Sequence, residues 1–152
     1  TASNAKVGSQ QVYEEAKRRK GELEDVLNGT VLNVEPNTEV AWENLIDIAP
    51  LMQLLGSAFE KHVTRYVASE TEFKKNSDEL KRYSELIAIL ATAATFENMP
   101  HADDDQFRAH AMELVQSARQ VVDAVVQRDP DAARIAGGNI GQACQKCHES
   151  YR

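Results

Sequence analysis

Apolar residues recur every three or four positions over most of the chain, which is the spacing of the buried side of an amphipathic α-helix. We predict four long helices of this kind, over about residues 38–63, 70–96, 104–128 and 130–151. No stretch alternates between apolar and polar positions for more than a few residues, and the best strand candidate is the short run GTVLNV at 29–34. The pattern therefore predicts an all-α fold.

Residues that favour caps and turns mark the ends of these helices. Asp103 to Asp105 precede the third long helix, where carboxylates cap free amides and interact favourably with the helix dipole. Asp129 followed by Pro130 is a clear start for the last helix. Pro50 falls inside the first long helix, where the loss of a backbone hydrogen bond predicts a kink or a restart.

The N-terminal part differs from the rest of the chain. A shorter helical pattern covers about residues 9–28, ends at Asn28-Gly29 and is followed by an extended connector with Pro36. Four long amphipathic helices with short links predict an antiparallel four-helix bundle. We therefore divide the chain into an N-terminal helical extension, residues 1–37, and a bundle, residues 38–152.

Composition and charge narrow the function classes. The 152 residues are 42% hydrophobic and 27% charged, which is typical of a globular protein. The net charge of −7 argues against a nucleic-acid partner, because such proteins present a basic face. No run of about 18 apolar residues is present, so we expect no membrane span. The small, polar start TASNAKVGSQ would suit a cleaved mature terminus or a frayed one.

The only two cysteines, Cys144 and Cys147, are followed directly by His148 in a C-x-x-C-H motif. A thioredoxin-like pair is disfavoured because such a pair adjoins a βαβ pattern. A zinc site is disfavoured because structural zinc takes four ligands, usually as two close pairs, and no second pair is present. The alternative without a function is an accidental pair of buried cysteines that happens to precede a surface histidine.

Covalent haem attachment accounts for every residue of the motif. Each cysteine sulfur would form a thioether with a haem vinyl group, and His148 would bind the iron. Residues three and four apart share a helix face, so the three side chains would lie together. Gly137, Gly138 and Gly141 precede the motif. Each glycine inside a helix lowers helix stability by roughly 1 kcal/mol relative to alanine. Close approach of a flat macrocycle or of a neighbouring helix would account for them.

The end of the chain combines spaced glycines, the C-x-x-C-H motif and a closing Tyr-Arg pair, on residues Gly138, Gly141, Cys144, Cys147, His148, Tyr151 and Arg152. In this it resembles the class II c-type cytochromes, which include cytochrome c′ and carry haem near the end of the last helix of a four-helix bundle. The resemblance covers about residues 38–152. It implies one haem c, bound covalently through both cysteines, and a periplasmic or otherwise exported protein, because haem attachment takes place outside the bacterial cytoplasm.

In that family the first bundle helix faces the open side of the iron, and MQLLGSAFEKH from Met52 onwards is similar to the matching stretch. The resemblance implies that Met52 is a sixth ligand, as in low-spin members, or lies beside an open position, as in cytochrome c′ proper. Methionine on an apolar helix face is also a common core residue. Arg152 matches a basic residue near the axial histidine, where its charge would raise the redox potential, although a last-turn arginine also complements the helix dipole.

Other sixth ligands are weaker candidates. Met99 falls in a loop and Met112 lies off the apolar face of its helix. His110 is a competent ligand at the edge of its apolar face, where histidine is more typical of a boundary position. His62 is ten residues beyond Met52, about 15 Å along a straight helix, so both cannot reach one iron.

We therefore expect an electron-transfer protein with His148 and Met52 as axial ligands. The alternative is a five-coordinate protein that binds nitric oxide or carbon monoxide on an apolar distal face. A peroxide-reducing enzyme is disfavoured because no distal set of histidine and arginine is evident, so we expect no enzymatic activity. The partners are then a redox protein, with a basic docking surface if the acidic charge guides it, and a second copy if the first helices pair to form a homodimer.

Overall fold

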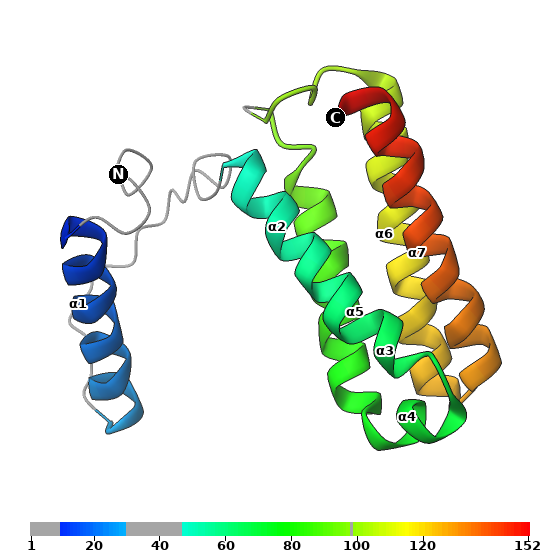
Figure 1. Ribbon diagram of the computed structural model, residues 1–152, viewed down its shortest axis with the longest axis horizontal. Helices are drawn as coiled ribbons and strands as arrows, with labels where there is room; N and C mark the ends of the chain where they lie inside the picture. The colour runs from blue at the N-terminus through cyan, green and yellow to red at the C-terminus, as the bar shows by residue number, and fades with distance from the viewer. Residues whose placement is uncertain (1–9, 30–46, 98) are drawn as a thin grey trace. The chain divides into compact units, whose positions relative to one another are not determined.

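The computed structural model describes residues 10–29, 47–97 and 99–152, and in these ranges the chain forms helices and no strands. This confirms the all-α expectation (Figure 1). The run at residues 30–34 and the predicted helix start at 38 lie outside the described residues. The helical elements are α1 (Gln10–Leu27), α2 (Ile48–Ala58), the π-helical turn η3 (Phe59–Val63), α3 (Thr64–Tyr66), α4 (Glu70–Lys75), α5 (Ser77–Ala93), α6 (Asp105–Gln127) and α7 (Pro130–Tyr151).

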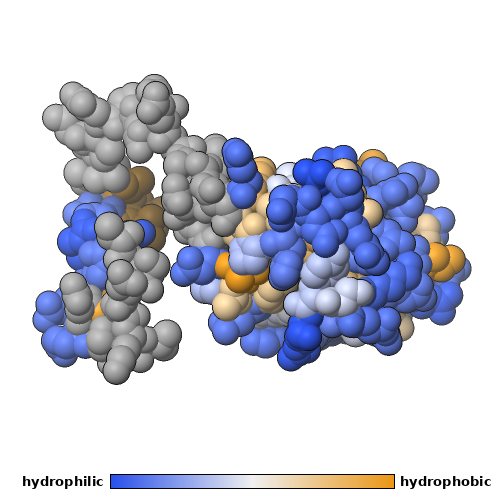
Figure 2. Space-filling model, turned by 90° about the horizontal axis from the view of Figure 1, so that it is seen from above, coloured by the Kyte–Doolittle hydropathy of each residue, from blue (hydrophilic) through white to orange (hydrophobic). Residues whose placement is uncertain are grey.

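Four long helical segments form the antiparallel bundle that the sequence predicts (Figure 1). The first runs through α2, η3 and α3, and the others are α5, α6 and α7. α6 makes the most extensive contacts, with α7 on one side and α5 on the other, and α2 packs on α5. The fully buried core includes Leu51, Leu80, Ile87, Val121 and Ile140, so every one of the four segments contributes to it. The face seen in Figure 2 is largely hydrophilic.

The break inside the predicted helix 70–96 lies at Asn76. Its backbone leaves helical geometry at φ −121° and ψ 24°, and its side-chain Nδ2 donates to the Glu72 carbonyl at 2.9 Å. The Asn76 side-chain amide thus donates a hydrogen bond to a carbonyl in the last turn of α4, and α5 starts at Ser77. Asparagine favours such local bonds over helix continuation, so one predicted helix becomes a short and a long one.

Pro50 does not kink the described helix. α2 begins at Ile48, with Asp47 as its N-cap in extended geometry, so Pro50 lies in the first turn. A backbone N–H has no intrahelical partner there, and proline is tolerated. The departure from α geometry occurs later, at η3. A π-turn adds one residue to a helical turn and rotates everything that follows it.

η3 turns the second half of this segment toward α5. The His62 ring stacks on Tyr83 with a centroid separation of 3.6 Å and an interplanar angle of 8°. Its Nδ1 lies 3.2 Å from the Tyr66 hydroxyl. Val63 is fully buried on the same segment. His62 therefore belongs to the helix packing, which agrees with its exclusion as a partner of Met52.

Two of the three α7 glycines serve close packing of helices. A Cβ added to Gly137 would lie 3.1 Å from Val67 Cγ2, and one added to Gly141 would lie 3.1 Å from Phe59 Cζ. A Cβ on Gly138 would meet nothing within 4 Å. Of the two explanations that the sequence left open, approach of a neighbouring helical segment is the one observed at Gly137 and Gly141.

The chain divides by its internal contacts into residues 1–40 and 41–152. In the first unit, α1 pairs its own charges: Arg18 bonds Glu15 and Glu22 on adjacent turns, and Lys20 bonds Glu24 at 2.9 Å. These pairs neutralise the charges of Arg18 and Lys20 on the surface of the helix itself. None of the described helices is both long enough and apolar enough to cross a membrane.

The contribution of the α7 N-cap to the stability of the fold can be tested separately from the cofactor. Asp129 Oδ1 accepts from the Asp131 and Ala132 amides at 3.1 and 2.9 Å. We expect Asp129→Ala to lower the free energy of unfolding by about 1 kcal/mol in urea titrations, because two amides lose their acceptor. Asp129→Asn keeps an acceptor oxygen and should lose much less. Equal losses in the two variants would contradict the capping role.

Candidate cofactor site

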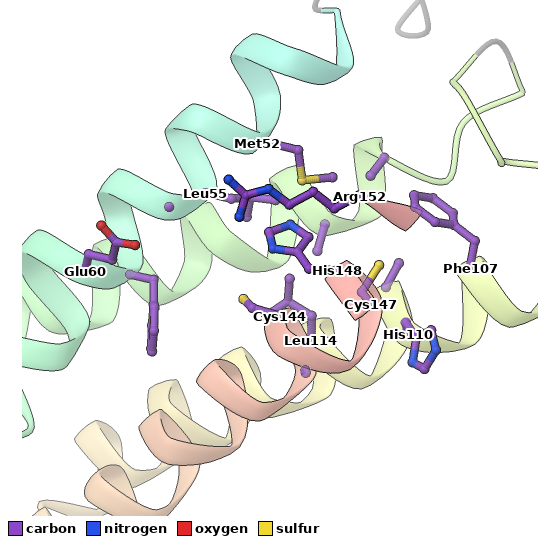
Figure 3. Close-up of a pocket in the computed structure, with 16 residues that line it drawn as sticks. Met52, Leu55, Glu60, Phe107, His110, Leu114, Cys144, Cys147, His148 and Arg152 are labelled. Carbon is purple, nitrogen blue, oxygen red and sulfur yellow. The ribbon is translucent and has the colours of Figure 1, made fainter. Parts of the chain in front are cut away.

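A cavity of about 220 Å³ opens at the end of the bundle where α7 ends and α2 begins. Its walls come from α2 with η3, from α5, from α6 and from α7 (Figure 3). Most of the lining is apolar. The lining residues are Met52, Leu55, Gly56, Phe59, Glu60, Ala91, Ala94, Phe107, His110, Ala111, Leu114, Ala143, Cys144, Cys147, His148 and Arg152.

The C-x-x-C-H motif lines this cavity from the last two turns of α7. Both cysteines are half-buried free thiols, and His148 is exposed. Burial raises the pKa of both thiols, and the nearby Glu60 carboxylate adds to the shift at Cys144. A raised pKa keeps the sulfurs protonated at neutral pH, which is the reverse of what a redox-active C-x-x-C pair requires.

The first bundle helix supplies the facing wall. The lining positions 52, 55, 56, 59 and 60 follow the spacing of one helix face. Met52 is half-buried, and its sulfur points into the same space as the His148 ring and the Arg152 guanidinium (Figure 3). All five residues that the sequence singled out, Met52, Cys144, Cys147, His148 and Arg152, therefore line one cavity.

The weaker ligand candidates differ in whether they line the cavity. His110 lines the cavity from α6, with its Nδ1 3.8 Å from a Glu113 carboxylate oxygen. Met99 is 5% exposed in the core and does not line the cavity, and Met112 is 53% exposed. His110 is thus the one alternative donor that reaches the cavity among these three.

A cross-helix ion pair holds the motif turn beside α6. Lys146 Nζ lies 2.8 Å from Glu113 Oε1, and this contact, together with His110, keeps the pKa of the Glu113 carboxyl below its ordinary value. Both side chains are about half exposed, so the pair contributes modestly to stability. The pair matters to the site because it holds α7 against α6 one residue before Cys147.

The sequence analysis gave no individual role to most of the lining residues, and two of these are informative. Glu60 is the one carboxylate in the lining, and Gly56 lies in the middle of α2. A Cβ added to Gly56 would meet nothing within 4 Å, so the packing of the described residues does not require glycine there. Both follow Met52 at helical spacing, which is the signal that could have located them.

The donor set fits a haem better than a bare metal ion. Two thiols, an imidazole and a thioether face an apolar slot, which are the attachment and axial groups of a c-type haem. Among the described residues, no group of three or more His, Cys, Asp or Glu side chains could hold a metal ion. The space at Gly56 would accommodate a flat group against the α2 backbone.

A comparison with protein families finds that the family Cytochrome C' matches residues 8–152. The chain belongs to the cytochrome c′ family. Proteins of this family bind haem c, serve electron transfer or gas binding, are generally not enzymes and are typically exported. The matched range includes α1 as well as the bundle. No curated protein and no solved structure matches the chain.

Alanine substitutions at two glycines distinguish a position that borders the cavity from one that faces solvent. Gly56→Ala and Gly138→Ala each meet no atom, so each should favour its helix by roughly 1 kcal/mol. In the haem-bearing protein we expect Gly138→Ala to keep this gain with an unchanged absorption spectrum. Gly56→Ala should lose the gain and shift the spectrum, because its methyl group enters the cavity. Identical spectra for the two variants would show that Gly56 does not border the haem.

Proposed function

We propose that this protein carries one haem c, joined by thioether bonds to Cys144 and Cys147, and transfers single electrons with His148 and Met52 as axial ligands. The observation that supports this is the convergence of Met52 and the C-x-x-C-H motif on one cavity from two different helices. The group itself supplies reversible one-electron chemistry when bound. The chain supplies attachment, axial donors and surroundings.

Apolar side chains would exclude water from both faces of the group. Leu55 lines the cavity from α2, Phe59 from η3 and Leu114 from α6. A low-dielectric wall disfavours the extra charge of the ferric state and therefore raises the reduction potential. Arg152 acts in the same direction and Glu60 in the opposite one. Because both charged residues are exposed, water screens their effect.

A five-coordinate protein that binds nitric oxide or carbon monoxide is the second candidate. The observation that favours it is the open space at Gly56, one helical turn from Met52. A small diatomic ligand could use that space if the Met52 sulfur packs against the wall and does not bind iron.

The setting follows from the proposed chemistry. We infer export to the periplasm, where c-type haem is attached and where free thiols would otherwise tend to oxidise. The physiological partner is then a redox protein, and the net charge of −7 favours a basic docking surface on it. A homodimer remains part of the proposal.

Covalent attachment is tested by denaturation. We expect the haem of the full chain to stay with the polypeptide in a denaturing gel or in acidified acetone, because thioether bonds survive unfolding. Cys144→Ala/Cys147→Ala should release all haem, and each single variant should retain one bond. A pigment that extracts freely from the unaltered chain would refute covalent attachment.

Axial ligation is tested at Met52. The ferric protein should be low-spin at neutral pH, and Met52→Ala should convert it to high-spin, as followed by absorption and electron paramagnetic resonance spectra. Met112→Ala is the matched control, because that side chain is 53% exposed on α6 and lies outside the cavity. A high-spin unaltered protein would favour gas binding. A low-spin protein that is insensitive to Met52→Ala would assign the sixth position to another donor.

A further inference from the structure

His110 is a titratable side chain in the cavity wall to which the proposed function gives no part. It lines the cavity from α6, and 17% of its side chain is exposed (Figure 3). The lining contains one other histidine, His148, which we propose as the iron ligand. Because histidine ordinarily changes its charge between about pH 5 and 8, a charge that can change stands in the cavity wall.

Glu113 supports a proton on His110. One carboxylate oxygen, Oε2, lies 3.8 Å from His110 Nδ1, and the other, Oε1, lies 2.8 Å from Lys146 Nζ. The bond from Lys146, and then the nearby His110, hold the pKa of the Glu113 carboxyl below its ordinary value. Glu113 is therefore ionised wherever histidine titrates, and a negative charge this close favours the protonated imidazole.

The groups of α7 that face His110 add no second change of charge in this pH range. The Tyr151 ring lies 6.5 Å from the His110 ring at an interplanar angle of 72°. Burial raises the pKa of the Tyr151 phenol, which therefore stays uncharged. Lys146 is paired with Glu113. Cys147 has no proton to release once its sulfur is joined to the haem.

The remaining charged residues of the lining give a constant background. Glu60 borders the cavity from η3 and Arg152 from the end of the chain, and both are exposed. Carboxylates and guanidinium groups are ordinarily charged throughout the range in which histidine titrates. His110 differs from both, because it is mostly buried and its charge can change. Water therefore screens His110 less than it screens these two residues.

A change of charge inside the cavity must act on His110. Reduction of a haem adds one negative charge to the site that holds it. A unit charge about 10 Å away alters proton binding by roughly tenfold when the effective dielectric constant is about 20. The linkage is reciprocal, so a proton on the histidine favours reduction by the same factor.

We propose that His110 binds a proton when the haem is reduced and releases it when the haem is oxidised, so that this protein couples electron transfer to proton transfer. The inference rests on the proposed function, because it takes the cavity as a site of one-electron chemistry. One electron comes from the redox partner and enters the iron. One proton comes from water and binds the ring nitrogen of His110 that carries none. Both leave again on oxidation.

The reduction potential of the haem-bearing protein should therefore fall as the pH rises through the histidine range. At low pH, His110 is protonated in both oxidation states, and its positive charge keeps the potential high. At high pH it is neutral in both, and the potential is low. A tenfold difference in proton binding corresponds to a total drop of about 59 mV for a one-electron couple. Spectroelectrochemical titrations between about pH 5 and 9 measure this drop.

His110→Gln should abolish the drop and hold the potential near its high-pH value, because glutamine is neutral at every pH. In weakly buffered solution, a pH indicator should record uptake of about half a proton per haem on reduction of the unaltered protein, the most that a tenfold difference gives. The variant should take up none. His101→Asn is the matched control. It removes an exposed histidine that lies outside the lining, and asparagine tolerates the left-handed φ of 64° at this position.

Glu113→Gln is the second variant, and it leaves His110 in place. It removes the carboxylate beside His110 Nδ1 and leaves Lys146 without its partner. Both changes disfavour a proton on His110, so the drop should keep its size and move to lower pH. A purely structural role of Glu113 would not move the pH range.

Three results would overturn the proton linkage: a potential that does not depend on pH, a drop that persists in His110→Gln, or a drop that is lost in His101→Asn. Any of these in a protein with attached haem and a reversible one-electron couple overturns the linkage alone. A chain without attached haem, or without such a couple, overturns the proposed function and the linkage with it.

Discussion

Close contact between α7 and the first bundle segment fixes the position of the cavity. Gly137 and Gly141 let Val67 and Phe59 approach the α7 backbone, at distances that leave no room for a β-carbon without displacement. Beyond Gly141, toward the chain end, the same two segments border the cavity. The two segments are thus in close contact at Gly137 and Gly141 and stand apart at the cavity that follows. A flat cofactor needs this combination, because the walls must be rigid and yet stand apart.

The π-turn reconciles these two demands on one stretch of chain. From α2 into the first two residues of the turn, one face of the segment, from Met52 to Glu60, borders the cavity. Further along the turn, His62 stacks on Tyr83 and Val63 enters the core. A continuous α-helix would rotate the second set relative to the first, so either the cavity wall or the α5 contact would be lost. π-turns are frequent at functional sites, and here the turn adjoins the cavity wall directly.

Periodicity and one motif were enough to predict the bundle, the α7 start at Asp129 and the placement of Cys144, Cys147 and His148 on one helix face. These features depend on local spacing, which the sequence displays. The resemblance to a known family was needed to bring in Met52 and Arg152. The break at Asn76 and the π-turn depend on which neighbour each side chain meets, so no local pattern marks them. Of the kink or restart predicted at Pro50, the described residues show a helix start at Ile48 and no kink, because a proline is tolerated in a first turn. The Lys146–Glu113 ion pair joins residues 33 apart in number, and spacing rules do not reach that far.

The two residues that we propose as axial ligands are held by different physical means, and this bears on what a bound iron could do. Met52 stands next to Leu51, which is fully buried, and one turn before Leu55, which is 7% exposed. Its backbone is therefore anchored by the core, and only its flexible side chain can adjust. His148 stands on the exposed last turn of α7. Strain on a bound iron would thus be relieved at the methionine by a change of rotamer and at the histidine by fraying of the helix end. A protein that carries electrons gains from suppressing both, because small changes in ligand geometry between oxidation states keep electron transfer fast.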